Sequence, residues 1–77
     1  MEKDPPIILV TGAAGQIGSE LTPELRKIFG SDNIIATDIK TIVSAELRDS
    51  GPYEILDVTD KTRIYKIIQQ NHISRIY

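Results

Sequence analysis

The hydrophobic pattern of this 77-residue chain consists of short apolar runs separated by longer amphipathic segments. Residues 7–10 form a continuous run of mostly branched side chains, which is typical of a strand buried on both faces. Residues 33–37 and 53–58 have the composition of a second and a third strand, and residues 73–77 indicate the start of a fourth. We therefore expect four strands in one sheet.

The segment after the first strand has the apolar spacing of an amphipathic helix. It follows a predicted turn at residues 11–15 and ends at Gly30. The apolar positions are spaced by four, four and three residues and form one expected core-facing stripe: Ile17, Leu21, Leu25 and Ile28.

A second helix is predicted over residues 61–71, behind a capping side chain at Thr59 or Asp60. Its apolar stripe consists of Ile64, Ile67 and Ile68. Residues 39–52 lack a clear pattern, apart from one or two helical turns over residues 44–49. The order of the elements is strand, helix, strand, irregular segment, strand, helix and strand. This order is typical of the α/β class, in which flanking helices cover a parallel sheet.

Composition narrows the classes of function. The chain has no cysteine and one histidine, so neither a disulfide nor a structural metal site is expected. The net charge of −2 gives no reason to expect a nucleic-acid partner. No apolar run is long enough to cross a bilayer, and the start MEKDPP lacks a signal-peptide core, so no membrane partner is expected. We expect a cytoplasmic protein, or a mitochondrial one if it is a processed eukaryotic form.

Three glycines stand where the first strand is followed by the first helix. In TGAAGQIG they are Gly12, Gly15 and Gly18, a spacing that differs from both G-x-G-x-x-G and the phosphate loop of nucleotide triphosphatases. A helix N-terminus at the end of a buried strand binds anions through unpaired N–H groups. We expect Gly12 to permit a tight turn, Gly15 to let a diphosphate approach, and Gly18 to let the helix pack closely. The alternative is a plain strand–helix corner without a ligand.

Asp38 ends the second predicted strand, twenty residues after Gly18. A carboxylate at this position accepts hydrogen bonds from the hydroxyls of an adenosine ribose and repels a 2′-phosphate. The nearest cation is Lys40, and no arginine flanks the position, so NAD is expected as the cofactor instead of NADP. The alternative is a solvated carboxylate at the end of a strand.

Asp57 lies at the end of the third predicted strand and is expected at the same edge of the sheet, where ligands of open parallel sheets bind. Its carboxylate would accept the adenine amino group while the backbone of Val58 meets the ring. An equally weighted alternative is that Asp57 caps the following helix.

These features resemble a known family. TGAAGQIG after a strand, the aspartate after the second strand and LDVTD after the third together resemble the extended short-chain dehydrogenase/reductase family, which includes nucleotide-sugar epimerases and dehydratases. Three longer strings are similar to those of its short-chain-type L-threonine 3-dehydrogenases: GQIGSELTPELRKIFG, DNIIATDIK and SGPYEILDVTD. The resemblance implies a partial Rossmann fold, with residues 1–77 as the N-terminal part of an NAD-binding domain.

The resemblance also implies which residues contact the cofactor. Those along the diphosphate would be Gly12, Gly15, Gln16, Ile17 and Gly18. Those at the ribose and adenine would be Asp38, Ile39, Asp57 and Val58. The implied reaction is the oxidation of L-threonine to 2-amino-3-oxobutanoate, with hydride transfer to NAD.

The catalytic pair of that family is absent from the chain. It consists of a tyrosine acid/base and a lysine four residues later, which lowers the tyrosine pKa. Asp57 and Gln69 stand four residues after Tyr53 and Tyr65, and Tyr77 is the last residue. We therefore expect the 77 residues to be inactive alone and to form the cofactor-binding part of a larger enzyme.

The fourth predicted strand is short, so one side of the first strand is expected to lack a partner. Because exposed apolar edges recruit other chains, we expect self-association or association with a missing C-terminal remainder.

Two other functions stay open. One is the cofactor half of a nucleotide-sugar epimerase or dehydratase, and the other is a non-catalytic nucleotide-binding module.

Overall fold

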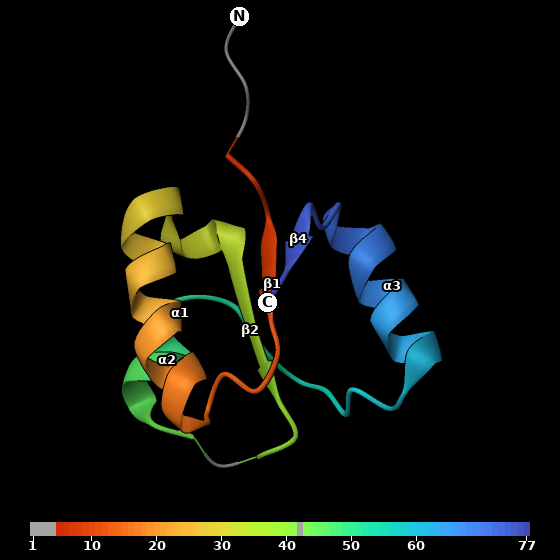
Figure 1. Cartoon of the computed structure of the whole chain (residues 1–77), viewed down its shortest axis with the longest axis horizontal. Helices are drawn as coiled ribbons and strands as arrows, with labels where there is room; N and C mark the ends of the chain where they lie inside the picture. The colour runs from red at the N-terminus through yellow and green to blue at the C-terminus, as the bar shows by residue number, and fades with distance from the viewer. Residues whose placement is uncertain (1–4, 42) are drawn as a thin grey trace, which may run out of the picture.

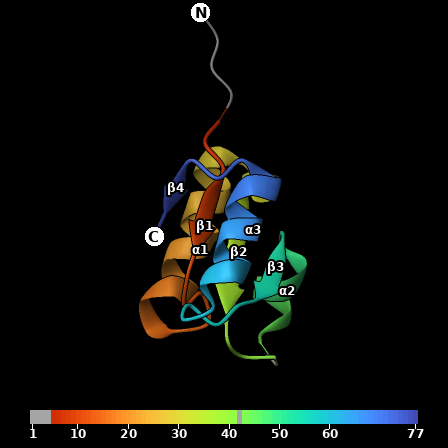
Figure 2. The same cartoon turned by 90° about the vertical axis from the view of Figure 1, so that its right-hand side faces the viewer.

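The computed structural model describes residues 5–41 and 43–77. Its elements in chain order are β1 (Ile8–Val10), α1 (Gln16–Phe29), the 3₁₀ helix η1 (Ser31–Asn33), β2 (Ile34–Asp38), α2 (Ala45–Asp49), β3 (Tyr53–Ile55), α3 (Lys61–Asn71) and β4 (Arg75–Ile76). All strands lie parallel in one sheet of order β3-β2-β1-β4 (Figure 2), which confirms the α/β class. No helix in the described part of the chain has the length and hydrophobicity needed to cross a membrane.

Helices cover both faces of the sheet (Figure 1). α1 and α2 lie on one face, and α3 lies on the other. Successive side chains of β1 and β2 point to opposite faces, so each strand contributes to two cores. The core beneath α1 and α2 contains Ile8, Val10, Ala13, Leu25, Ile34, Ala36 and Leu47. The core beneath α3 contains Leu9, Ile35, Leu56 and Ile67.

α1 presents a different face to the sheet from the one that its apolar spacing predicts. Its buried residues are Gly18, Thr22, Leu25 and Arg26. Ile17 and Ile28 are 80% and 68% exposed, so the predicted stripe is wrong at these two positions. The cause is the close packing of Gly18 on the turn before the helix, where an added Cβ would stand 2.8 Å from the Cα of Ala13. This contact sets the rotation of the helix about its axis and leaves Ile17 outside.

β1 is paired on both sides, so the expectation of an unpaired side is wrong. Ile8 pairs with Ile34 of β2 and with Arg75 of β4. Beyond β4, the N–H of Thr11 donates to the carbonyl of Tyr77 at 2.8 Å. The short β4 is sufficient because β1 itself has three residues, and β4 becomes the exposed edge. Self-association stays a prediction.

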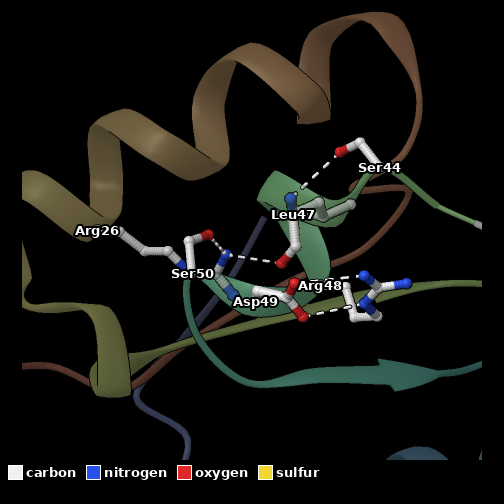
Figure 3. A network of polar contacts seen from close by, with 6 residues as sticks. All are labelled: Arg26, Ser44, Leu47, Arg48, Asp49 and Ser50. Atoms are coloured by element: carbon white, nitrogen blue, oxygen red, sulfur yellow. Dashed lines mark hydrogen bonds and ion pairs between the residues drawn. The ribbon is translucent and has the colours of Figure 1, made fainter.

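The third strand is shorter than predicted. After β3 the N–H of Leu56 still donates to the carbonyl of Asp38 at 2.9 Å, and the chain then leaves the sheet. Asp60 caps α3 by accepting the N–H of Arg63 at 3.1 Å, as one of the two expected caps. In the irregular segment, Ser44 caps α2 by accepting the N–H of Leu47 at 3.2 Å (Figure 3).

Candidate nucleotide-binding site

The loops that follow β1, β2 and β3 gather at the carboxyl edge of the sheet, at the lower end of the molecule in Figure 1. Two pockets that share Gly12 open there. One, of about 200 Å³, is lined by Gly12, Asp38, Ile39, Leu56, Asp57 and Val58. The other, of about 410 Å³, is lined by residues that include Gly12, Gly15, Gln16, Ile17, Gly18 and Tyr77. All nine predicted contact residues therefore line one of two adjoining pockets.

The turn between β1 and α1 leaves backbone donors open at the start of the helix. Gly12 has φ +64°, a conformation that favours glycine, and its carbonyl accepts the N–H of Gly15 at 2.9 Å. The first intrahelical bond runs from the N–H of Ser19 to the carbonyl of Gly15. The N–H groups of residues 16–18 precede that bond, and Gly15 has no side chain that could cap them. This arrangement fits an anionic diphosphate.

The turn is attached to the last two residues of β2. The N–H of Ala13 donates to the carbonyl of Thr37 at 2.9 Å, and the N–H of Ala14 donates to Oδ2 of Asp38 at 2.9 Å. The hydroxyl of Thr37 donates to the carbonyl of Val10 at 2.7 Å. The end of β2 therefore holds the glycine turn in place.

Asp38 is a buried carboxylate, 7% exposed, so the alternative of a solvated strand-end side chain is wrong. Oδ1 accepts the N–H of Lys40 at 3.0 Å, and Oδ2 accepts that of Ala14. Burial alone would raise the pKa of Asp38, but these bonds, a further backbone bond from Ile39 and the charge of Lys40 lower it overall. Each oxygen of an ionised carboxylate has two acceptor positions, so capacity for ribose hydroxyls is left.

Asp57 lies in the loop beyond β3. Its Oδ1 accepts both the hydroxyl of Thr59 at 2.7 Å and the N–H of Thr59 at 2.9 Å, and these bonds lower its pKa. Because Asp60 caps α3, the alternative in which Asp57 is that cap is wrong. Oδ2 of Asp57 has no hydrogen-bond partner among residues 5–41 and 43–77. The exposed side chains of Ile39 and Val58 line the same pocket.

Some residues of these pockets were not predicted. Leu56 lines the smaller pocket, and Thr11 and Tyr77 line the larger one. The position of Leu56 directly before Asp57 was a usable signal, because neighbouring residues at a strand end approach the same edge. Tyr77 has no such signal, since its place depends on how β4 pairs with β1.

Comparisons with known proteins agree with this geometry. The model of the NAD dependent epimerase/dehydratase family matches residues 8–77. The chain is 47% identical over 62 residues to an uncharacterized epimerase/dehydratase of Staphylococcus aureus (strain USA300). The matched region covers 80% of this chain and 19% of that protein.

Solved structures of two L-threonine dehydrogenases are also similar. The enzyme from Clostridium difficile has a TM-score of 0.87 and 43% identity, over 96% of this chain and 23% of that one. The holo form of the GalE-like enzyme from Cupriavidus necator has a TM-score of 0.83 and 32% identity, over 94% of this chain and 23% of that one. The chain thus spans about a fifth of the length of these relatives.

The predicted resemblance to the extended short-chain dehydrogenases is confirmed, as are the Rossmann-like sheet and NAD as the expected cofactor. The contacts of the nine site residues with NAD stay predictions. With its glycine turn, buried carboxylate and parallel sheet, the chain belongs to the NAD-dependent epimerase/dehydratase family and forms a nucleotide-binding region of that family.

Proposed function

We propose that this chain binds the adenosine diphosphate half of NAD within an L-threonine 3-dehydrogenase. The observation that carries the proposal is the convergence of Gly12, Asp38 and Asp57, from three separate segments of the chain, on one pocket at the carboxyl edge of the sheet. When bound, NAD would accept the hydride released as the β-hydroxyl of L-threonine is oxidised to give 2-amino-3-oxobutanoate.

The glycine turn would hold the diphosphate. The N–H groups of residues 16–18 have no intrahelical acceptor and stand at the positive end of α1. Gly15, which has no Cβ, borders the larger pocket, so backbone and phosphate oxygens can come close. Gln16 and Ile17 contribute mainly through their backbone and position.

The end of β2 and the loops after β2 and β3 would hold the adenosine. Asp38 accepts the ribose hydroxyls through the acceptor positions that its backbone partners leave open. Ile39 and Val58 supply exposed apolar surface on which an adenine ring can lie. Oδ2 of Asp57 accepts the exocyclic amino group. A carboxylate at Asp38 disfavours a 2′-phosphate, so NAD is preferred over NADP.

The substrate assignment is supported by the 43% identity to a solved L-threonine dehydrogenase. The family description also covers epimerases and dehydratases, and the 47% identical relative carries that description. An assay of the full-length protein distinguishes a threonine dehydrogenase from an epimerase or dehydratase. NADH formed from L-threonine supports the dehydrogenase, whereas conversion of a nucleotide sugar supports the epimerase or dehydratase instead. The 77 residues alone should give no threonine-dependent NADH, because no tyrosine is followed by a lysine four residues later.

Cofactor binding is tested directly by ligand-observed NMR titration of the protein with AMP, NAD and NADP. Asp38→Ala should weaken AMP binding by about tenfold or more, since hydrogen bonds to a charged group are lost, and should reduce the preference for NAD over NADP. Asp32→Ala is the matched control, because Asp32 is an exposed aspartate before β2 at the opposite edge. Unchanged AMP affinity in Asp38→Ala would mean that the ribose assignment is wrong.

A further inference from the structure

We propose that Tyr53 is a positioning residue for the adenosine half of the site: it holds the backbone of Lys40 in the conformation that the nucleotide requires. The assignment rests on the proposed function, since it concerns the same pocket. Tyr53 lies outside the nine residues that the family resemblance assigns to NAD, and it does not line the pocket itself.

The backbone of Lys40 is held from both sides. Its carbonyl accepts the hydroxyl of Tyr53 at 2.7 Å, and its N–H donates to Oδ1 of Asp38 at 3.0 Å. Lys40 itself is exposed, and so is the neighbouring Ile39 that lines the pocket. These two hydrogen bonds therefore hold a segment that has little burial of its own.

The Tyr53 ring is anchored well enough to hold that segment. Tyr53 begins β3 and pairs in register with Ala36 of β2. The carbonyl of the preceding Pro52 accepts the N–H of Ala36 at 3.0 Å. The ring is half-buried and packs against the core beneath α1 and α2. A phenol with only two side-chain torsions and a packed ring presents its hydroxyl at a defined place.

The hydroxyl is suited to donate to a carbonyl. Burial, together with the charge of Asp38, raises the pKa of Tyr53, so the phenol stays protonated at neutral pH. The donor is therefore present in a titration at neutral pH.

The consequence for binding follows from the position of Lys40, which directly follows Ile39 and stands two residues after Asp38. Ile39 and Oδ1 of Asp38 keep their places in the pocket only while the backbone of Lys40 keeps the conformation that both hydrogen bonds hold. Without the Tyr53 bond, a smaller fraction of the molecules has the binding conformation, and the apparent dissociation constant rises in inverse proportion to that fraction. Loss of one hydrogen bond corresponds to a rise of about threefold to tenfold.

The test compares Tyr53→Phe with Tyr65→Phe in the same protein. Tyr65 is a 65% exposed tyrosine on α3, and its hydroxyl has no hydrogen-bond partner among residues 5–41 and 43–77. AMP affinity, measured by NMR titration, should fall about threefold to tenfold in Tyr53→Phe and stay within experimental error in Tyr65→Phe. In the ligand-free protein, the amide hydrogen of Lys40 should exchange faster in Tyr53→Phe alone.

The outcomes separate this inference from the proposed function. A Tyr53→Phe protein that binds AMP as the wild type does, with unchanged exchange at Lys40, overturns the positioning role and leaves the proposed function intact. A purely structural role would lower the melting temperature and leave the AMP affinity of the folded protein unchanged, which also overturns it. A wild-type protein that fails to bind AMP and NAD refutes the proposed function, and the role of Tyr53 falls with it.

Discussion

Polar groups gather at the amino edge and at the carboxyl edge of the sheet. At the amino edge the chain itself supplies most of their hydrogen-bond partners, and at the carboxyl edge it leaves several of them open. At the amino edge, before β2 and β3, the charged side chain of Arg26 is 5% exposed and is surrounded by acceptors from its own chain. At the carboxyl edge, the N–H groups of residues 16–18 and the carboxylate of Asp57 border open pockets. Both edges carry charged side chains and backbone hydrogen-bonding groups. They differ in whether the chain itself supplies the hydrogen-bond partners of these groups.

The amino edge is closed by hydrogen bonds that the guanidinium of Arg26 donates (Figure 3). Nη1 of Arg26 donates to Oγ of Ser50 at 2.7 Å and to the carbonyl of Leu47 at 3.2 Å. Nη2 donates to the carbonyls of Pro52 at 2.7 Å and Ile34 at 3.3 Å. Burial lowers the pKa of Arg26, but an arginine still keeps its proton. One side chain thereby connects α1, α2 and the starts of β2 and β3.

Gly51 packs tightly against the guanidinium of Arg26. A Cβ added to Gly51 would stand 2.6 Å from Nε of Arg26, and Nε is the one buried side-chain nitrogen or oxygen without a partner in the described ranges 5–41 and 43–77. We conclude that polar burial at this edge contributes to stability, whereas open donors and acceptors at the other edge mark the binding site. Three changes test this contrast.

The largest effect is expected from Gly18→Ala at the carboxyl edge. The new Cβ meets the carbonyl oxygen of Gly12 and the Cα of Ala13, both backbone atoms that yield only if the turn shifts. Overpacking of this kind costs about 3 kcal/mol of unfolding free energy. The displaced turn should also weaken AMP binding in the molecules that stay folded.

Ser19→Ala is the control for Gly18→Ala, because Ser19 is exposed on the next position of the same helix. Chemical denaturation and an AMP titration measure both effects. An alanine at position 18 that leaves stability and affinity unchanged would show that the helix does not need to approach the turn so closely.

A smaller effect, limited to stability, is expected from Arg26→Met at the amino edge. The variant keeps much of the side-chain volume but removes a charged donor from the buried carbonyls of Leu47 and Ile34, which costs about 2 kcal/mol. AMP affinity of the folded protein should not change, since Arg26 lies at the opposite edge from the pockets. Thermal melts and AMP titrations are compared with those of Lys27→Met, a change at an exposed neighbour. A marked loss of AMP affinity in Arg26→Met would contradict the conclusion that the amino edge contributes to stability and not to binding.

The smallest effect concerns pH. Because the pKa of Asp38 in the folded protein is lowered, its ionised form stabilises the fold above the unfolded value of about 4. That contribution is lost as the pH falls through the lowered folded value. The difference in unfolding free energy between wild type and Asp38→Asn should thus be constant from about pH 7 to 5 and shrink below about pH 4.

Glu20→Gln, a change at an exposed carboxylate on α1, provides the baseline for that titration. A difference that already declines between pH 7 and 5 would contradict the lowered pKa, and with it the hydrogen-bonded geometry of Asp38.

The sequence alone was sufficient to predict the α/β class, the order of the elements, and the placement of the glycine turn, Asp38 and Asp57 at one edge of the sheet, whereas Gln16, Ile17 and Ile39 were implied only by the family resemblance. The reason is that these features depend on local signals. Branched apolar runs indicate buried strands, and a glycine turn or an aspartate at a strand end can be placed at the carboxyl edge by chain order alone. Parallel strands bring their carboxyl ends together, so residues from three separate segments could be assigned to one site without coordinates.

The tertiary structure decided which polar residues are buried and which apolar ones are not. Ile17 and Ile28 fitted a helical stripe, but the contact of Gly18 with the turn rotates Thr22 and Arg26 inward instead. A buried arginine cannot be predicted from periodicity, because its burial depends on carbonyl groups from three distant segments that meet only in the fold. The bond from Tyr53 to Lys40 likewise depends on the placement of β3 beside β2, which no local pattern encodes.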